Sequence, residues 1–536
     1  MLLDTLKNTA FYIADYWKDN DSLLIRDVPL TKKQCVSLSV AATTTYVLWK
    51  LYKRSIRSTV DPSLLPPMVK GALPLYGHLN KLKKDPAKFL DEARDTYGPC
   101  FRITVPGQGT VVVATGTVIE EIMKANKNFS FFKGIELVFP SAKVVELSYQ
   151  HKWEVETISP RAKNPTIYPI KQNFKEHQID VFTERIMKSF EAGLKKHFDL
   201  KKGEREEVDV WPLMGLLVAN ISCACFAGSQ ATGNEALIRG MATFTQKIGK
   251  ASMFWTVLPQ WLGQFIIRHF FSVEKEMDYI MGELVPHLTK VRNGELGDDY
   301  EETYATMVLN LPKEDGSLRS VPDAAYHFNA IALASIHTTS HFTTFALHEL
   351  APRPQLVEDL RAELATLGDN RTPETVAKLS LMDSFFREVL RHNDNYLGLH
   401  HLTLKDSTLS TGHVVPKDSV VVLSVDQMHR DLRFLPIDQE TGEPVAGETP
   451  LSEFDAYRYH NKKVKSTNVG LEFLPFGMGA HACPGRFFAA NEIKYMVAEI
   501  LMRYNVTTKT GLRAKDNVFL GMIRFPPKEP LIFEAI

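Results

Sequence analysis

The sequence lacks an excess of charge, a cysteine framework and a long uninterrupted apolar run. Its 63 basic side chains are balanced by 63 acidic ones, so nothing in the charge suggests a nucleic-acid partner. Its five cysteines are odd in number and do not have the even, dense spacing of a secreted disulfide protein, so we expect a reducing compartment. With 44% hydrophobic residues in a chain of 536, there is enough apolar material to bury a large core.

Two of the cysteines, Cys223 and Cys225, are close enough in sequence to raise the question of a metal site. They lie in the segment VANISCACFAG, whose composition is typical of a buried apolar helix. A buried free cysteine behaves as a small hydrophobic residue. We therefore favour core packing over metal binding for this pair.

The amino-terminal part contains one short apolar span. Residues 35–52 hold a single charge, Lys50, and a helix of this length covers about 27 Å, close to the roughly 30 Å hydrocarbon core of a bilayer. We predict a membrane anchor here; a soluble packing helix is the alternative, favoured by the serines and threonines in the span. Residues 1–34 form an extension with helical apolar spacing that suits a membrane surface. Residues 53–74 form a proline-rich linker to a body at 75–536.

The body begins with mixed helix and strand, including a segment with helical periodicity that ends at Gly98, and continues with helices. Residues 101–116, FRITVPGQGTVVVATG, alternate as in a two-stranded hairpin that turns at 106–109. From about Gln172 to Pro352 the chain consists mostly of long segments with helical apolar periodicity. The sequence therefore predicts a mainly α fold with a smaller β-rich lobe, preceded by the anchor helix.

One cysteine, Cys483, lies in a glycine-punctuated loop directly ahead of a predicted helix. Gly477 and Gly479 permit a tight backbone whose amide N–H groups point at the sulfur, and Pro484 suits the first helical position. We expect these donors and the helix dipole to lower the thiol pKa. A single thiolate without further cysteine or histidine ligands nearby does not make a tetrahedral zinc site, but it suffices as the axial ligand of a haem iron.

Residues 476–485, FGMGAHACPG, resemble the haem-binding signature of the cytochrome P-450 superfamily, Phe-Gly-x-Gly-x-(Arg/His)-x-Cys-x-Gly, at every fixed position. The resemblance implies haem b, iron protoporphyrin IX, with its metal held by the thiolate of Cys483. His481 then occupies the place of a donor to a haem propionate. The cofactor-binding residues that the resemblance implies in this loop are Cys483, His481, Phe476, Gly477 and Gly485.

A competing interpretation of the same loop is the dinucleotide-binding pattern G-x-G-x-x-A, which Gly477, Gly479 and Ala482 also fit. Pro475 interrupts the strand that this pattern requires, and no βαβ pattern surrounds it. We therefore prefer the haem-binding interpretation. Elsewhere in the chain, His400 and His401 lie where family members often carry a basic residue for the other propionate, and of the two we favour His401.

Residues 334–339, ASIHTT, resemble the family's oxygen-activation segment, (Ala/Gly)-Gly-x-(Asp/Glu)-Thr-Thr, within a long apolar segment that predicts a central helix. The resemblance implies that Thr338 supplies a hydroxyl for proton transfer. Ser335 replaces the usual glycine and His337 the usual acid, and we include both as catalytic candidates. A histidine can relay protons near neutral pH, but a buried neutral histidine can equally be a spectator, and both interpretations of His337 stay open.

Glu388 and Arg391 are three residues apart, so they can pair on one face of a helix. Their order and their distance from the cysteine loop resemble the family's Glu-x-x-Arg pair, and a solvated surface pair is the alternative. The resemblance adds Arg458 as the third member of a buried clamp, although Ala456 stands where the family usually has proline. We assign this triad to folding and to the integrity of the haem pocket.

The resemblance implies a monooxygenase that oxidises a small apolar molecule. The chain has no flavin or nicotinamide fingerprint and no iron-sulfur cysteine cluster of its own, so we expect electrons from NADPH to arrive through a diflavin reductase. The nearest likeness is to membrane-bound fungal members that tailor terpenoids, alkaloids and polyketides, which implies the endoplasmic reticulum membrane with a cytosolic catalytic body. The phenylalanine-rich residues 129–145 are either a substrate contact or core.

Two other functions stay open on the sequence. A haem-thiolate isomerase or dehydratase would work without a reductase, and the missing acid at His337 motivates it. A non-catalytic haem or lipid carrier is the third possibility, against which the retained Thr338 and the complete cysteine loop argue.

Overall fold

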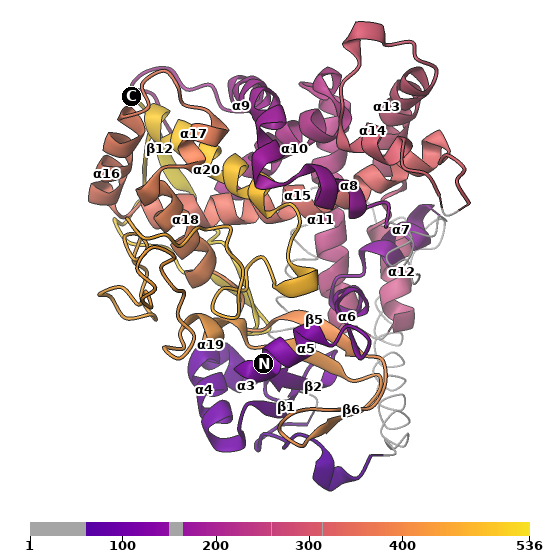
Figure 1. Ribbon diagram of the computed structural model, residues 1–536, viewed down its shortest axis with the longest axis vertical. Coiled ribbons are helices and arrows are strands. Elements are labelled where there is room, and N and C mark those ends of the chain that lie inside the picture. Colours follow the sequence, from indigo (N-terminus) through magenta and orange to yellow (C-terminus); the bar gives the residue numbers. More distant parts are fainter. Residues whose placement is uncertain (1–59, 75, 150–163, 259, 314) are drawn as a thin grey trace, which may run out of the picture.

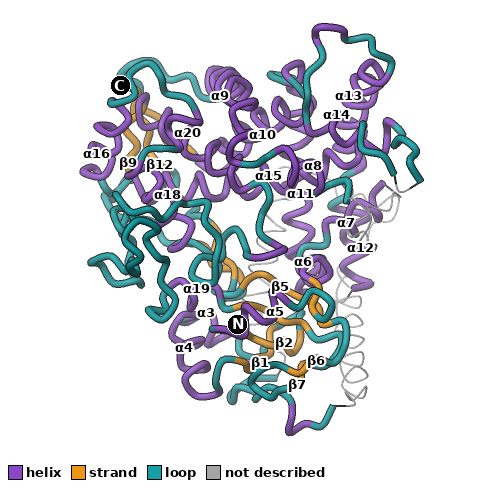
Figure 2. The backbone as a smooth tube through the Cα atoms, viewed as in Figure 1, coloured by secondary structure: helices purple, strands orange, loops and turns teal. Residues whose placement is uncertain are grey.

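The computed structural model describes residues 60–74, 76–149, 164–258, 260–313 and 315–536. Within these ranges the chain is mainly helical, and most strands gather in one lobe (Figures 1 and 2). The predicted mainly α fold with a smaller β-rich lobe is therefore confirmed. The predicted anchor at 35–52 and the extension at 1–34 lie outside the described residues.

The helices and strands have the following bounds. The α-helices are α3 (Leu79–Lys84), α4 (Pro86–Tyr97), α5 (Thr117–Lys124), α6 (Phe131–Val138), α7 (Ser141–Tyr149), α8 (Tyr168–Asn173), α9 (Thr183–His197), α10 (Val210–Ala227), α11 (Glu235–Val257), α12 (Gln260–Phe270), α13 (Glu274–Arg292), α14 (Tyr304–Leu309), α15 (Val321–Leu350), α16 (Pro354–Ala365), α17 (Pro373–Ala377), α18 (Ser380–His392), α19 (Val425–His429) and α20 (Arg486–Arg503). The strands are β1 (Cys100–Val105), β2 (Gly109–Ala114), β3 (Phe129–Ser130), β4 (Arg205–Val208), β5 (Gly398–Thr403), β6 (Ser407–Thr408), β7 (Val414–Val415), β8 (Val420–Leu423), β9 (Tyr504–Thr507), β10 (Asn517–Phe519), β11 (Ile523–Phe525) and β12 (Leu531–Ala535). Short 3-10 helices are η1 (Pro62–Leu64), η2 (Glu176–Phe182), η3 (Ser229–Ala231), η4 (Gly297–Asp299) and η5 (Gly479–His481).

The largest sheet joins strands from residues 100–130 to strands from residues 398–423. Its strand order is β1-β2-β8-β5-β3, and β1 and β2 form the predicted hairpin, with Val105 opposite Gly109. β2 pairs in parallel with β8. Side chains alternate along β2, so Val111 packs into one apolar cluster and Val112 into another. Because both faces of the sheet are covered, β5 and the residues that follow it are held firmly beside the amino-terminal strands.

α15 is the central helix that the sequence predicts. Ser320 caps it by accepting a hydrogen bond from the amide of Asp323, and it ends at Leu350, ahead of Pro352. It packs against α10, α11, α13, α14 and α20 and crosses the middle of the molecule (Figure 1).

α10 is apolar on all sides because it lies in the core. Among the described residues, it is the one helix long and apolar enough to cross a membrane, but 78% of that stretch is buried inside the protein. Cys223 and Cys225 lie on it with no solvent exposure, and burial raises the pKa of both thiols. The complete burial of both side chains agrees with core packing for Cys223 and Cys225.

The helix after the cysteine loop begins later than the sequence predicts. α20 starts at Arg486 with Gly485 as its N-cap, so the prediction of Pro484 as the first helical residue is wrong. Pro484 stays in the turn, which leaves the amides of Gly485 and Arg486 free to point at the sulfur of Cys483. Residues 474–478 form no strand, which removes the structural context of a dinucleotide-binding loop.

Candidate active site

The cysteine loop is closed by its own backbone. The amide of Cys483 donates to the carbonyl of Phe476 at 2.7 Å, and the amide of Gly477 donates to the carbonyl of Leu474 at 2.7 Å. Gly477 has φ of 64°, and a Cβ atom there would lie 3.0 Å from the carbonyl oxygen of His481. Glycine is therefore needed at this position for both conformation and space.

The pKa of the Cys483 thiol follows from two opposed influences. Burial raises the pKa of this half-buried thiol, and the amides of Gly485 and Arg486, with the charge of Arg486, lower it by a smaller amount. The predicted net lowering is therefore wrong for the chain alone, because desolvation outweighs the donors. A bound metal ion deprotonates a coordinating thiol, and the two amides then stabilise the resulting thiolate.

His481 of η5 and His401 of β5 come together although they are far apart in sequence. Their ring centroids are 6.3 Å apart, and both rings contact Phe131 of α6. His481 Nε2 lies 2.7 Å from Oδ1 of Asn126. α6 approaches β5 closely at Gly134, where a Cβ atom would collide with the carbonyl of His400.

His401 carries a buried nitrogen that fits an acidic group. Its Nδ1 lies 2.6 Å from the carbonyl of Leu399, which can only accept, so Nδ1 carries the proton. Its Nε2 is buried and has no hydrogen-bond partner among the described residues. Burial lowers the pKa of His401 to about 4. A carboxylate placed beside Nε2 would favour the doubly protonated ring, so this position fits a haem propionate.

His400 is also buried, and its Nε2 likewise has no partner in the described part of the chain. Of the two rings, that of His401 is in contact with His481. Leu399, which directly precedes His400, has a positive φ of 48°. It lies at an irregularity in the pairing of β5, a β-bulge between Gly398 and His401. The preference for His401 stays a prediction.

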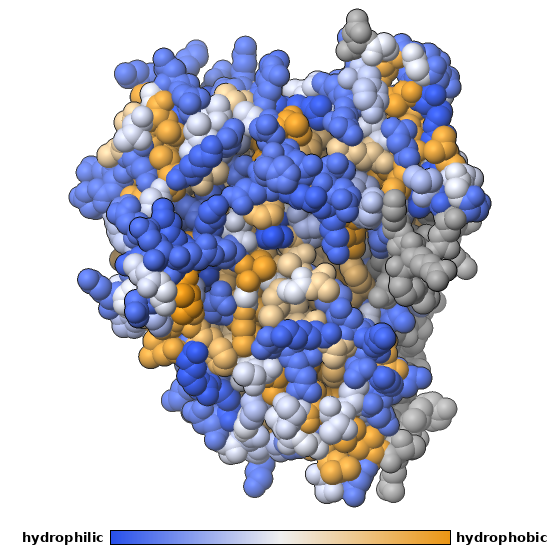
Figure 3. Space-filling model, viewed as in Figure 1, coloured by the Kyte–Doolittle hydropathy of each residue, from blue (hydrophilic) through white to orange (hydrophobic). Residues whose placement is uncertain are grey.

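Thr338 lies on an open face of α15. The side chains of Thr338 and Ala334 are exposed on a helix whose other faces are largely buried. Thr338 Oγ1 donates to the carbonyl of Ala334 at 2.6 Å, so its hydroxyl oxygen can still accept a hydrogen bond. Figure 3 shows apolar residues gathered in the middle of the molecule, between the helical part and the strand-rich lobe.

Ser335 and His337 point to other neighbours. Ser335 Oγ lies 3.1 Å from Oγ of Ser222 on α10. The ring of His337 lies 6.1 Å from that of Phe139 and 6.2 Å from that of Trp211, centroid to centroid. Burial lowers the pKa of His337. The three catalytic candidates thus lie close together on α15 but contact different neighbours, and their roles stay predictions.

The structure brings the three clamp residues together in the core. Both guanidinium nitrogens of Arg391 that face Glu388 lie 2.7 Å from its carboxylate oxygens, and Nε of Arg458 lies 3.3 Å from Oε1. Glu388 is fully buried, and the two arginines are nearly so. Their remaining N–H groups donate to backbone carbonyls between residues 429 and 453. The triad therefore fastens the long irregular segment after α19 to α18.

Three features of the site were not foreseen. Asn126 contacts His481 from 355 residues away, and no local pattern marks it. Arg387 is fully buried, with its guanidinium 3.8 Å from the centroid of the Phe473 ring. Its position next to Glu388 in the sequence is the one feature that could have indicated its burial.

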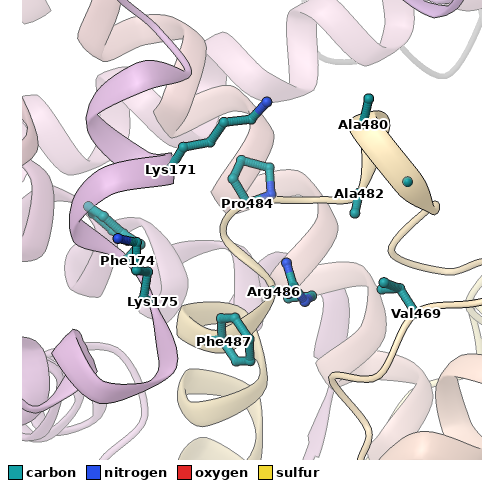
Figure 4. A pocket seen from close by; sticks show the side chains of 10 residues that line it. Lys171, Phe174, Lys175, Val469, Ala480, Ala482, Pro484, Arg486 and Phe487 are labelled. Atoms are coloured by element: carbon teal, nitrogen blue, oxygen red, sulfur yellow. The ribbon is translucent and has the colours of Figure 1, made fainter.

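The third is a pocket beside the cysteine loop, with a volume of about 460 Å³ (Figure 4). Lys171 and Lys175 come from α8 and the turn after it, and Arg486, Phe487 and Pro484 come from the loop and the start of α20. The pocket thus combines cationic and apolar side chains.

A mainly helical fold in which the one half-buried thiol of the described residues lies directly ahead of a core helix is typical of the haem-thiolate oxidoreductases. The chain belongs to the cytochrome P450 family, whose sequence model matches residues 66–532. The predicted family is therefore confirmed, and we identify the protein as a monooxygenase of this family.

Named relatives support this membership. Cytochrome P450 monooxygenase 71 of Postia placenta is 27% identical over 512 residues, which cover 92% of this chain and 96% of the relative. Ent-kaurene oxidase of Gibberella intermedia is 26% identical over 351 residues, 61% of this chain and 62% of the relative. Cytochrome P450 monooxygenase ascG of Acremonium egyptiacum is 27% identical over 388 residues, 65% and 71% of the two chains.

Proposed function

We propose that this monooxygenase holds haem b through Cys483 and oxidises a small apolar intermediate of secondary metabolism, with electrons from NADPH delivered by a diflavin reductase. The observation that carries this proposal is the cysteine loop, in which two amides face the sulfur and the backbone closes on Phe476. When bound, the haem supplies the redox chemistry that splits dioxygen and places one of its oxygen atoms in the substrate.

The chain's own residues have distinct tasks in this proposal. Cys483 holds the cofactor as a thiolate, and the amides of Gly485 and Arg486 balance its charge. His481 and His401 bind the propionates. Thr338 accepts and passes protons through its hydroxyl on the open face of α15.

Electron delivery is proposed for the side of the cysteine loop that carries the pocket of Lys171, Lys175 and Arg486. The chain as a whole has no net charge, so these three cations give this face a local positive charge that the chain as a whole does not share. Complementary charge steers partner proteins to one face and makes their association depend on salt. An acidic surface on the reductase would dock here.

The substrate class rests on the relatives and on the residues near the site. One relative is named as an ent-kaurene oxidase, which supports a terpenoid; alkaloids and polyketides stay within the proposal. The ring of Phe131 contacts that of His401, and the ring of Phe139 contacts that of His337. Such half-buried aromatic walls suit an apolar ligand. We further propose that residues 35–52 anchor the protein in the endoplasmic reticulum membrane, with the catalytic body in the cytosol.

The proposal is tested with the full chain in microsomes that contain a diflavin reductase. A panel of terpenoids, alkaloids and polyketides is supplied with NADPH and ¹⁸O-labelled dioxygen. We expect NADPH-dependent and reductase-dependent product that carries one labelled oxygen atom. A product that forms at the same rate without NADPH and reductase would contradict the proposal.

One observation favours a second candidate, a haem-thiolate isomerase or dehydratase. The residue at the usual place of the acid, His337, is kept neutral by burial and packs against Phe139 and Trp211. A site that does not deliver protons suits a rearrangement that consumes no electrons. Turnover of an already oxygenated substrate without reductase, and without incorporation of labelled oxygen, would support this candidate.

A further inference from the structure

His429 lies between the clamp helix and the cysteine loop, and both of its ring nitrogens are used. The amide of Leu474 donates to Nε2 at 3.0 Å. Since an amide nitrogen can only donate, Nε2 carries no proton and Nδ1 does. Nδ1 lies 3.0 Å from the carbonyl of Arg391 and donates to it. The two bonds fix one tautomer and one orientation of the ring.

The link to α18 is reciprocal. One guanidinium nitrogen of Arg391, whose other nitrogens pair with Glu388, donates to the carbonyl of His429 at 2.9 Å. His429 therefore receives a hydrogen bond from the same residue to which its ring donates. α19 cannot shift along α18 without breaking both bonds.

The other end of the link leads directly into the cysteine loop. Leu474, whose amide is held by His429, accepts at its carbonyl from the amide of Gly477 at 2.7 Å. The next residue but one along the chain from Leu474, Phe476, accepts from the amide of Cys483 at 2.7 Å. A short series of backbone bonds therefore runs from the ring of His429 to the residue that carries the thiol.

Burial makes this link costly to lose. Leu474 is 1% exposed and His429 3% exposed, so water cannot replace the ring as acceptor for the Leu474 amide. A buried donor left without a partner is unfavourable, because the hydrogen bond that it makes to water in the unfolded chain is not replaced. The loop would then relax to satisfy the amide elsewhere, and its turn at Gly477 would move with it.

We propose that His429 is a positioning residue that ties the Glu388–Arg391 clamp to the cysteine loop and so holds Cys483 in the geometry that keeps its thiolate on the haem. This inference rests on the proposed haem binding through Cys483. It assigns the clamp a route to the cofactor through the two ring nitrogens of His429.

The ring stays neutral over the working pH range, so the link is permanent. Burial and the charges of Arg391, Arg387 and Arg524 lower the pKa of His429 to about 3, and the bond to the Arg391 carbonyl only partly offsets them. The Phe473 ring, 6.1 Å from that of His429 between centroids, covers it on the loop side.

The test compares three substitutions of His429 in the full holoprotein. His429→Gln can place an amide oxygen near the position of Nε2 and keep an acceptor for Leu474. His429→Asn can reach only the Arg391 carbonyl, and His429→Phe makes neither bond. The readout is the absorption spectrum of the reduced, carbon-monoxide-bound protein, which separates thiolate ligation from neutral-thiol ligation, taken at equal haem content.

We expect the ratio of neutral-thiol to thiolate form to rise about tenfold in His429→Asn and His429→Phe, equivalent to ~1.4 kcal/mol. In His429→Gln the ratio stays within about twofold of the native value. His348→Phe is the control, because His348 is as deeply buried as His429, at 1% against 3% exposed, but it lies on α15, and its Nδ1 has no partner among the described residues. It leaves the ratio unchanged even if it lowers the melting temperature.

Two results would overturn the inference: a native ratio in His429→Asn, or equal loss of thiolate in His429→Gln and His429→Asn. If His429→Phe does not fold, the Gln and Asn pair still decides. A native protein that binds no haem at all would instead refute the proposed function, so the two failures are distinguishable.

Discussion

The two sides of the candidate haem site are built in different ways. On the cysteine side, hydrogen bonds run from Arg391 through His429 and Leu474 to the loop of Cys483. On the distal side, Thr338 bonds to its own helix, and the buried Nδ1 of His341 has no partner among the described residues. The cysteine side is thus fixed by a hydrogen-bond network, whereas the distal side is held by local helix bonds and ring packing.

This difference explains where the sequence departs from the family pattern. A substitution on the cysteine side would leave several buried groups unpaired, and every fixed position of the signature at residues 476–485 matches, although Ala456 replaces the usual proline near the clamp. Ser335 and His337 replace the usual residues on the distal side, where Ser335 bonds to Ser222 and the ring of His337 packs against other rings. Ring packing tolerates substitution better than a connected hydrogen-bond network, in which each lost partner leaves a buried polar group unpaired.

The largest expected effect is the loss of the clamp. Glu388→Gln leaves Arg391 and Arg458 buried without a full counter-charge, which costs about 3–5 kcal/mol. We expect loss of most haem and a large fall in the midpoint of urea unfolding. The control is Glu374→Gln, whose exposed pair with Lys378 lies on α17 and contributes less than ~0.5 kcal/mol. Equal effects of the two substitutions would contradict a buried clamp.

On the distal side, Thr338→Ala removes the hydroxyl that we propose for proton transfer. We expect the yield of product per NADPH to fall on the order of tenfold, with the balance released as hydrogen peroxide. Thr343→Ala is the control, because Thr343 is buried on the same helix and bonds only to the carbonyl of Thr339. Full coupling in Thr338→Ala would remove the proposed role.

A substitution at His341 tests whether the buried histidines on the distal side lower the stability of the folded protein at acidic pH. Burial and the nearby His337 lower its pKa from 6.5 to about 3, so the unfolded chain binds a proton more readily than the folded one. Its contribution to stability is therefore present above pH 6.5 and falls by up to ~1.4 kcal/mol per pH unit below that value.

His341→Phe removes this loss. We expect the midpoint of urea unfolding to decline less steeply between pH 6.5 and pH 4 in the variant than in the native protein. An unchanged slope would show that His341 is not buried in its neutral form.

The smallest effect is expected at His337. Burial lowers its pKa and its ring packs against Phe139 and Trp211, so we expect it to be neutral and uninvolved in proton delivery. His337→Gln should keep coupling within about twofold of native at neutral pH and above. A loss as large as that of Thr338→Ala would instead assign the proton relay to His337.

The same comparison shows what sequence alone can predict. The cysteine loop, the hairpin of β1 and β2 and the helical middle follow from local patterns, because glycine, alternation and helical spacing act over a few residues. The contact of Asn126 with His481 and the link through His429 join residues tens to hundreds of positions apart, and no short pattern records them. The sequence does not predict the raised pKa of the Cys483 thiol, because burial, unlike an amide donor, is a property of the whole fold.

The central claim is that the thiolate of Cys483 holds the haem iron. The most direct test is the absorption spectrum of the reduced, carbon-monoxide-bound holoprotein, native and Cys483→Ser, with Cys225→Ser as a buried control that lies on α10. We predict the thiolate-type spectrum for the native protein and for Cys225→Ser, and its complete absence in Cys483→Ser. A native protein without this spectrum, or a Cys483→Ser variant that keeps it, would contradict the account.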